Sequence, residues 1–234
     1  MTRVAILQSN YLPWKGYFDI AAAVDLFIFH DDLQYTKNDW RNRNLIKTSG
    51  GLKWLTIPCG TSEKRLICEV TLDASDWQMK HWRQIEAAYH AAPFFGEFAP
   101  YFKDIFLKNV WRSLSELNQR LIRDIAQFLA IDCRFDDSRA YHLQHRKAKR
   151  VLELLQKTGA ASYLSGPAAK KYLNQDDFEQ AGIELRWADY SGYPEYPQLY
   201  PPFRHEVSII DLLFNTGSAA RNYLKNKGGD VNAC

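Results

Sequence analysis

The sequence predicts an α/β fold with a Rossmann-like, mostly parallel sheet flanked by helices and with a helical middle segment. Residues 4–7 ("VAIL") and 25–30 ("DLFIFH") are short continuous apolar runs, as expected for buried strands. Between them, residues 15–24 ("KGYFDIAAAV") place their apolar side chains at helical spacing. A strand, a helix and a strand in this order form a βαβ unit, which implies parallel pairing and a right-handed crossover.

The rest of the chain continues this alternation of strands and helices. In chain order we expect a strand at 53–59, helices at 76–89, 116–131 and 148–158, strands at 161–166 and 184–190, and a helix at 207–217. The turn signal "TSGG" at 48–51 leaves open a hairpin between the strand at 53–59 and residues 44–48. Residues 90–102 indicate a connection or a broken helix, and the Pro-rich stretch 193–203 indicates an extended ordered loop.

Composition favours one ordinary globular domain. The 234 residues are 46% hydrophobic and 24% charged, and we expect a single domain over 1–234 with a helical insert at about 74–145. The four cysteines are isolated, which predicts reduced thiols rather than disulfides or structural zinc. The N-terminus lacks the apolar core of a signal peptide and no run reaches the length of a membrane span, so we expect a soluble, cytoplasmic protein.

The charge balance does not favour a nucleic-acid partner. Thirty basic and 27 acidic residues give a net charge of +3, and only residues 142–150 ("HLQHRKAKR") form a basic cluster. This cluster is typical of a solvated helix start, and its alternative is a patch that faces phosphate. The 14% aromatic content is the unusual feature, because flat side chains with polar edges suit sugar, nucleotide or partner surfaces as well as cores.

Polar side chains follow three of the expected strands. In open α/β sheets ligands bind beyond the carboxyl ends of the strands, so these residues are the first site candidates. They are Gln8, Asn10 and Tyr11 after the first strand, His30, Asp31 and Asp32 after the second, and Ser165 and Gly166 after the strand at 161–166.

Asp31 and Asp32 are the candidates for catalysis, together with His30. Adjacent carboxylates at a strand end can hold a divalent metal or supply a general base, although neighbours on a strand point to opposite faces, so at most one aims into the site. The structural alternatives are loop-capping aspartates that pair with Lys37, Arg41 or Arg43, and a packed strand histidine.

Two further segments suggest ligand contacts. In "NDWRNRN", at 38–44, three amides, one acid and two guanidiniums lie within seven residues. The guanidiniums of Arg41 and Arg43 are fork-like donors suited to carboxylate, phosphate or sugar hydroxyls, provided that a loop lets them converge, and Asp39, Trp40 and Asn42 are candidate ligand contacts in the same segment. In the turn after the first strand, Pro13 and Gly16 fit either backbone contact with an anion or a plain tight turn. Ser165 precedes Pro167 at a strand-to-helix turn and is interpreted as an N-cap or a hydroxyl donor, because "YLSGP" lacks the G-x-S-x-G spacing of a hydrolase nucleophile.

The motifs "LQSNYLPWKGYFD", "FHDDLQYTKNDWRNRN" and "YLSGPAAKKYL" resemble the WbqC-like proteins, which are bacterial proteins found with genes for O-antigen and other surface polysaccharides. The resemblance extends from Ile6 to about Gly217. It implies nucleotide-sugar or amino-sugar modification, with attachment of a small acyl or aminoacyl group.

A more distant resemblance concerns residues 14–17. Nucleotidyltransferases of Rossmann-like fold carry H-x-G-H after the first strand, and Trp14-Lys15-Gly16-Tyr17 has this pattern with both histidines replaced. Trp14 and Tyr17 cannot offer an imidazolium charge to a phosphate. The resemblance therefore implies a related fold in which ATP-dependent adenylylation is lost or altered.

The leading hypothesis is a transferase that brings an activated acyl or aminoacyl donor to an amino sugar or a similar polar acceptor. Its expected substrate-binding residues are Gln8, Asn10, Tyr11, Trp14, Gly16, Tyr17, Gln34, Tyr35, Asp39, Trp40, Arg41, Asn42, Arg43, Ser165 and Gly166. A non-catalytic sugar-nucleotide or partner-binding module and a metal-dependent glycosyltransferase are the alternatives, and "HDD" lacks the D-x-D spacing of the latter. The sequence leaves the cofactor open between Mg²⁺ and a nucleotide, and it leaves the oligomeric state open.

Overall fold

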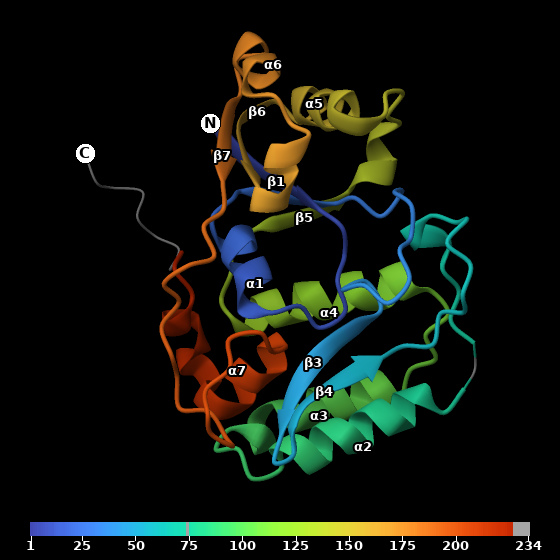
Figure 1. Ribbon diagram of the computed structural model, residues 1–234, viewed down its shortest axis with the longest axis vertical. Helices are drawn as coiled ribbons and strands as arrows, with labels where there is room; N and C mark the ends of the chain where they lie inside the picture. The colour runs from blue at the N-terminus through green and yellow to red at the C-terminus, as the bar shows by residue number, and fades with distance from the viewer. Residues whose placement is uncertain (74, 227–234) are drawn as a thin grey trace.

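Five parallel strands form the central sheet, in the order β5-β2-β1-β6-β7, and a computed structural model describes residues 1–73 and 75–226 (Figure 1). This confirms the predicted α/β class. The strands are β1 (Thr2–Leu7), β2 (Leu26–Phe29), β3 (Arg43–Thr48), β4 (Gly51–Thr56), β5 (Arg134–Asp137), β6 (Ala160–Ser165) and β7 (Glu184–Trp187). The α-helices are α1 (Lys15–Ala22), α2 (Trp77–Tyr89), α3 (Phe95–Leu107), α4 (Leu114–Phe128), α5 (Lys147–Lys157), α6 (Gln175–Gln180) and α7 (Ile209–Thr216). Short 3-10 helices are η1 (Ile67–Glu69), η2 (Ser138–Tyr141), η3 (Pro167–Lys171) and η4 (Gly217–Tyr223).

The neighbouring strands β1 and β2 bury apolar residues on both faces because helices cover both sides of the sheet. Alternate residues enter different cores: Ala5 and Phe29 join the core that contains α1, α4 and α7, whereas Ile6 and Ile28 join the core under α5 and α6. Figure 1 shows α5 and α6 on one side and α1 and α4 on the other. Continuous apolar runs were therefore the correct signal for these strands.

The hairpin left open by the "TSGG" turn is present. β3 and β4 pair antiparallel as a separate sheet, with Leu45 opposite Trp54 and Thr48 opposite Gly51. Gly51 has φ +103°, a conformation that side-chain-bearing residues rarely adopt. In Figure 1 the hairpin lies below the main sheet, between α4 and the pair α2 and α3. β3 contributes Asn44 to the lining of the candidate site.

Several elements differ from the prediction. Residues 95–102, expected in a connection or broken helix, belong to α3, which continues through Pro100 because Phe98, Phe102 and Phe106 bury one face. The prediction missed β5 and α6, which are only 4 and 6 residues long and lack clear periodicity. Gly166, rather than Ser165, is the N-cap of η3.

The expected insert at about 74–145 contains α2, α3 and α4 but also β5, which is an edge strand of the main sheet. Phe135 of β5 packs on Phe29 with ring centroids 5.6 Å apart. The middle segment thus contributes to the central sheet as well as to the helical layer. The stretch 193–203 forms no regular helix or strand, as expected for the predicted loop.

Candidate functional site

The loop after β1 is held beside the turn at 39–42 by backbone and amide hydrogen bonds. The Tyr11 N–H donates to the Trp40 carbonyl over 2.9 Å. The Asn44 amide donates to the carbonyls of Tyr11 and Leu12, at 3.1 and 2.7 Å. Because both segments are fixed by backbone groups, their side chains are positioned by the fold rather than by loop flexibility.

A cavity of about 330 Å³ opens between this loop, the turn and the segment before α7. It is lined by Asn10, Pro13, Trp14, Trp40, Asn44, His205 and Glu206. Asn10, Trp14 and Trp40 were predicted to bind substrate. Asn44, His205 and Glu206 were not, because only tertiary packing brings residues 205–206 to the β1 loop: Ile209 N donates to the Pro13 carbonyl at 2.9 Å.

Asn10 presents an amide to the cavity in a fixed orientation. Its Oδ1 accepts from Arg41 Nη1 at 3.0 Å, and Arg41 Nη2 pairs with Asp39 Oδ2 at 2.6 Å. The carboxylate of Asp39 thereby compensates the charge of Arg41, and Arg41 contacts the cavity lining through Asn10. The Asn10 amide nitrogen makes no hydrogen bond within residues 1–73 and 75–226, which leaves two donors for a ligand.

His205 supplies an imidazole that is neutral near physiological pH. Burial, and then the charge of Lys15, lowers its pKa from 6.5. Its Nδ1 is buried and lacks a hydrogen-bond partner in the described part of the chain, and its ring packs edge-on against Phe203. A neutral imidazole beside a cavity can accept a proton. The adjacent carboxylate, Glu206, is paired with Arg204.

Lys15 begins α1 behind this wall, in a pocket of aromatic rings. The Lys15 Nζ lies 5.2 Å from the ring centroids of both Tyr193 and Tyr196 and donates to the Pro194 carbonyl at 2.9 Å. Its side chain is 3% exposed, and burial lowers its pKa to about 8. Lys15 thereby ties the extended stretch 193–203 to the start of α1.

Within the described part of the chain, several buried polar atoms that lack a hydrogen-bond partner belong to the cavity lining or to the segments next to it. Besides His205 Nδ1, they include Ser9 Oγ, Arg41 Nε, Asn42 Oδ1 and Asn118 Oδ1. Asn118 belongs to this group because its amide donates to the Arg41 carbonyl at 2.8 Å. Native proteins satisfy most buried polar groups, so such a cluster indicates a functional location or bound water.

Asp31 supports the β1 loop instead of facing the cavity. It is fully buried, and its Oδ1 accepts from the Ser9 N–H at 2.7 Å. Its Oδ2 accepts from the Ser115 hydroxyl and, at 3.2 Å, from the Gln119 amide. Both carboxylate oxygens are therefore used by donors of the chain itself.

Asp32 and His30 belong to a second network at the end of β2. Asp32 accepts from Ser138 Oγ at 2.5 Å and pairs with Arg150. Arg150 Nε donates to His30 Nε2 at 3.1 Å, so this nitrogen carries no proton. Burial lowers the pKa of His30 to about 4. The basic cluster at 142–150 thus supplies one ion-pair partner to Asp32, whose side chain remains 16% exposed.

Tyr11, Tyr17 and Gly16 shape the loop from inside. The Tyr11 hydroxyl donates to His81 Nδ1 at 2.8 Å, since His81 Nε2 donates to the Thr56 carbonyl. The Tyr17 hydroxyl donates to the Gln8 carbonyl at 3.0 Å. A Cβ on Gly16 would lie 2.2 Å from the indole of Trp14, so Gly16 makes room for that ring.

The remaining predicted residues lie farther from the cavity. Gln34 is exposed and bridges to Leu66, and Tyr35 is buried under the guanidinium of Arg65. Ser165 is 2% exposed at the end of β6. Gly166 approaches the cavity wall through Tyr190, whose ring lies 5.2 Å from that of Trp14. Asn42 donates its amide to the Ile57 carbonyl, and Arg43 stacks on Trp54.

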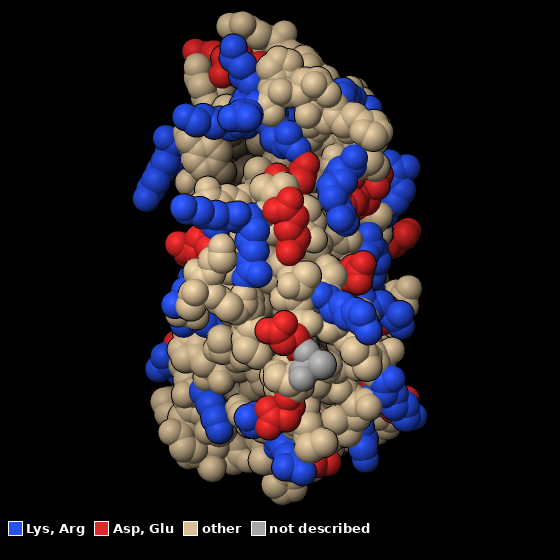
Figure 2. Space-filling view, turned by 90° about the vertical axis from the view of Figure 1, so that its right-hand side faces the viewer, with Lys and Arg blue, Asp and Glu red and all other residues tan. Residues whose placement is uncertain are grey.

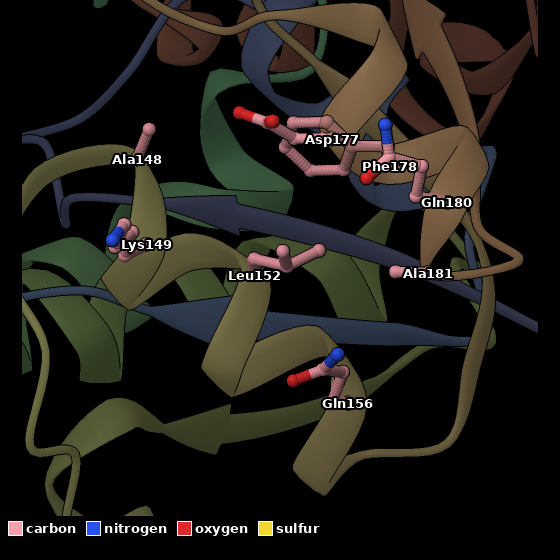
Figure 3. Close-up of a pocket in the computed structure, with 8 residues that line it drawn as sticks. All are labelled: Ala148, Lys149, Leu152, Gln156, Asp177, Phe178, Gln180 and Ala181. Carbon is pink, nitrogen blue, oxygen red and sulfur yellow. The ribbon is translucent and has the colours of Figure 1, made fainter.

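A second hollow of about 290 Å³ lies between α5 and α6 (Figure 3). Leu152, Phe178 and Ala181 contribute its apolar part, with Lys149 and Asp177 around it. Ala148 and Lys149 belong to the basic cluster at 142–150, for which a patch that faces phosphate was the alternative, and the other lining residues carried no functional prediction. Figure 2 shows acidic side chains in the middle of one face with Lys and Arg on both sides, so this face has no uninterrupted basic surface.

Two properties of the described residues bear on cofactors and membranes. Within 1–73 and 75–226, no three His, Cys, Asp or Glu side chains are grouped so that they could hold a metal ion. None of the helices in these ranges has the length and apolarity needed to cross a bilayer.

The fold and the site define a Rossmann-like α/β protein with a cavity at the loop after its first strand, where such sheets commonly bind small ligands. The chain belongs to the WbqC-like protein family, whose family model matches residues 8–223. It is also similar to the uncharacterized protein Rv1507c of Mycobacterium tuberculosis (strain ATCC 25618 / H37Rv), with 46% identity over 227 residues that cover 96% of this chain and 98% of that protein. No solved structure matches the chain.

Proposed function

We propose that this chain is a transferase that moves an acyl or aminoacyl group onto an amino sugar or a similar small polar acceptor, in bacterial polysaccharide or related small-molecule biosynthesis. The observation that supports it is the cavity in which a free amide, a neutral imidazole and a carboxylate lie beside two tryptophans. Aromatic faces with a few convergent polar groups are typical of small-molecule sites.

In this proposal His205 is the general base. The acceptor's nitrogen attacks the acyl carbon, the bond to the donor's leaving group breaks, and His205 takes the proton that the nitrogen loses. Asn10 orients the acceptor through its free amide donors, and Glu206 accepts from its hydroxyl or amino groups. Asp31 acts as a positioning residue, because it holds Ser9 next to Asn10.

Asp32 and His30 keep a proposed role in the separate network at the end of β2. Asp32 is partly exposed and paired with Arg150, so the pair offers opposite charges to a polar group of the donor. His30 accepts from Arg150 and fixes the orientation of the guanidinium.

The transfer is tested with acetyl coenzyme A, or glycine with ATP, as donor and glucosamine 1-phosphate or UDP-glucosamine as acceptor, with products detected by mass spectrometry. We expect wild-type protein to add the acyl mass to an acceptor and His205→Asn to reduce turnover about 10²- to 10⁴-fold while acceptor binding persists. His145→Asn is the matched control, because His145 is exposed and bonded to Glu153. Wild-type turnover by His205→Asn would exclude the proposed base.

A non-catalytic binding module is the second candidate, since donors of the chain occupy both oxygens of Asp31 and also bind Asp32. Thermal shifts separate the two, because a ligand raises the unfolding temperature according to its affinity for the folded state. A larger shift with donor and acceptor together favours the transferase. A shift with a sugar nucleotide alone, and no product from any pair, favours the module.

A further inference from the structure

Two tryptophans are exposed side by side, and one of them belongs to the cavity lining. Trp40 and Trp54 are 44% and 41% exposed, with ring centroids 5.7 Å apart and planes inclined by 42°. Trp40 also lines the cavity. Trp40 and Trp54 are among the exposed large apolar side chains of the described residues, and an adjacent exposed pair that continues a cavity indicates a binding surface.

A cation lies on the same surface. The Arg43 guanidinium carbon is 4.2 Å from the Trp54 ring centroid, which is stacking distance. Within residues 1–73 and 75–226 no acidic side chain forms an ion pair with Arg43. Its neighbour Arg41, by contrast, is paired with Asp39. The surface therefore offers an uncompensated planar cation that can bind phosphate or carboxylate through two parallel hydrogen bonds.

The hairpin holds these groups in place. Leu45 pairs with Trp54, and Arg43 pairs with Thr56, so Arg43 and Trp54 are diagonal neighbours on one face of the hairpin. Asn44 and Leu55 on the opposite face are buried. Trp40 is anchored separately, since its carbonyl accepts from the Tyr11 N–H at 2.9 Å. Trp40, Arg43 and Trp54 form what we call the tryptophan shelf.

We propose that the tryptophan shelf binds a phosphorylated sugar, with an apolar face of the pyranose ring on Trp40 and Trp54 and the phosphate on Arg43. The proposal rests on the proposed function and names the chemical class of its acceptor. Stacking on the shelf directs the hydroxyl or amino groups of the ring into the cavity, where the Asn10 amide donates and Glu206 accepts. The two indoles provide the apolar surface for the sugar ring, and the Arg43 guanidinium provides the charge that binds the phosphate.

The shelf is tested by binding alone, so the outcome does not depend on turnover. Isothermal titration with α-D-glucose 1-phosphate is compared with glucose, inorganic phosphate and uridine 5′-monophosphate. Wild-type protein is expected to bind glucose 1-phosphate more tightly than either glucose or phosphate. Trp40→Ala and Trp54→Ala are expected to weaken this binding roughly tenfold each, a ratio that corresponds to about 1.4 kcal/mol.

Arg43→Ala is expected to lower the affinity for glucose 1-phosphate about tenfold and to leave the affinity for glucose unchanged. Arg43→Lys is expected to recover part of the affinity for glucose 1-phosphate. Lys53→Ala is the control, since it removes an exposed charge from β4 of the same hairpin and should bind as wild type does. An unchanged midpoint of thermal unfolding in each variant confirms that it is folded.

Three results would overturn the proposal. The first is that wild-type protein does not bind glucose 1-phosphate, and the second is that the shelf variants bind it with wild-type affinity. The third is that the shelf variants lose only the binding of uridine 5′-monophosphate, which would make the shelf a base-stacking site. If shelf variants lose the binding of glucose 1-phosphate but no donor gives product, the proposed sugar-phosphate site is supported and the proposed transferase function is rejected. If transfer occurs and shelf variants keep full activity and affinity, only the proposed sugar-phosphate site at the shelf is rejected.

Discussion

The carboxylate of Asp31 accepts a hydrogen bond of 2.7 Å from the backbone N–H of Ser9, a residue 22 positions earlier in the chain. This contact joins the end of β2 to the loop that forms the cavity. It explains why a buried aspartate follows β2 although it does not reach the cavity. The aspartate replaces a backbone acceptor that the end of the sheet cannot supply to Ser9.

Asp31→Asn tests this support. An amide keeps one acceptor but turns an NH₂ group toward the Ser115 hydroxyl or the Ser9 N–H, so we expect the free energy of unfolding to fall by about 1–3 kcal/mol. Affinity for a cavity ligand should fall as well, because Asn10 follows Ser9. Urea unfolding and titration calorimetry measure both effects. Asp132→Asn, at an exposed position, is the control, and equal stability of the two variants would contradict the supporting role.

The ion pair between Arg150 and Asp32 predicts the titration of His30. Burial is the main cause that lowers the pKa of His30 to about 4, and the charge of Arg150 lowers it further. In Arg150→Gln the pKa of His30 should therefore rise, because the repulsion from Arg150 is gone while the carboxylate of Asp32 remains. NMR titration of the imidazole protons measures this change. Lys149→Gln changes an exposed neighbour and should leave the pKa of His30 where it is.

His81 makes the stability depend on acid. It is neutral in the folded protein because burial lowers its pKa to about 4, whereas the unfolded chain titrates near 6.5. Between these values the unfolded chain binds more protons, so the free energy of unfolding is highest above pH 6.5 and falls as the pH drops toward 4. One such group lowers the free energy of unfolding by about 3 kcal/mol over this pH range, because each unit of difference between the folded and unfolded pKa corresponds to roughly 1.4 kcal/mol.

His81→Leu isolates this contribution. Replacing the imidazole should flatten the pH dependence of unfolding between pH 6.5 and 4, leaving the part that His30 contributes. Urea unfolding at several pH values gives the slope. An unchanged slope in the variant would show that another group controls acid stability.

The central strands and the long helices could be predicted because each has a local signal. Residues 4–7 of β1 and all of β2 are continuous apolar runs, and α4 has one apolar face. β5 could not be predicted, since "RFDD" is short and mostly polar and becomes a strand only by pairing with β2. The Pro100 signal misled for residues 95–102, because the buried phenylalanines of α3 outweigh one lost hydrogen bond.

The candidate site divides in the same way. Asn10, Trp14 and Trp40 could be placed because they follow β1 or lie in an aromatic-rich polar segment. His205 and Glu206 could not, since their approach depends on the pairing of Trp14 with Ser208 across almost the whole chain. Nor does sequence tell that Asp31 faces inward, because the choice between adjacent residues depends on the donors that surround them.

Gly16 lies at the start of α1, and Gly96 of α3 is a control position for its substitution by alanine. A Cβ on Gly16 would meet the indole of Trp14 at 2.2 Å, whereas a Cβ on Gly96 of α3 would meet nothing within 4 Å. Gly16→Ala must therefore displace Trp14 from the cavity wall, and we expect lower stability by about 1–3 kcal/mol and weaker ligand binding. Gly96→Ala should raise stability by up to about 1 kcal/mol, since alanine favours the helix.

Thermal unfolding and ligand titration of the two variants separate local strain from general helix propensity. If Gly16 served only as a tight turn, Gly16→Ala would change stability without affecting the ligand. If the glycine makes room for the indole, loss of stability and loss of affinity must occur together. Replacing the indole by a smaller side chain, with Trp14→Leu in the Gly16→Ala background, should then restore stability but not affinity. Recovery of both would mean that the Trp14 ring makes no contact with the ligand.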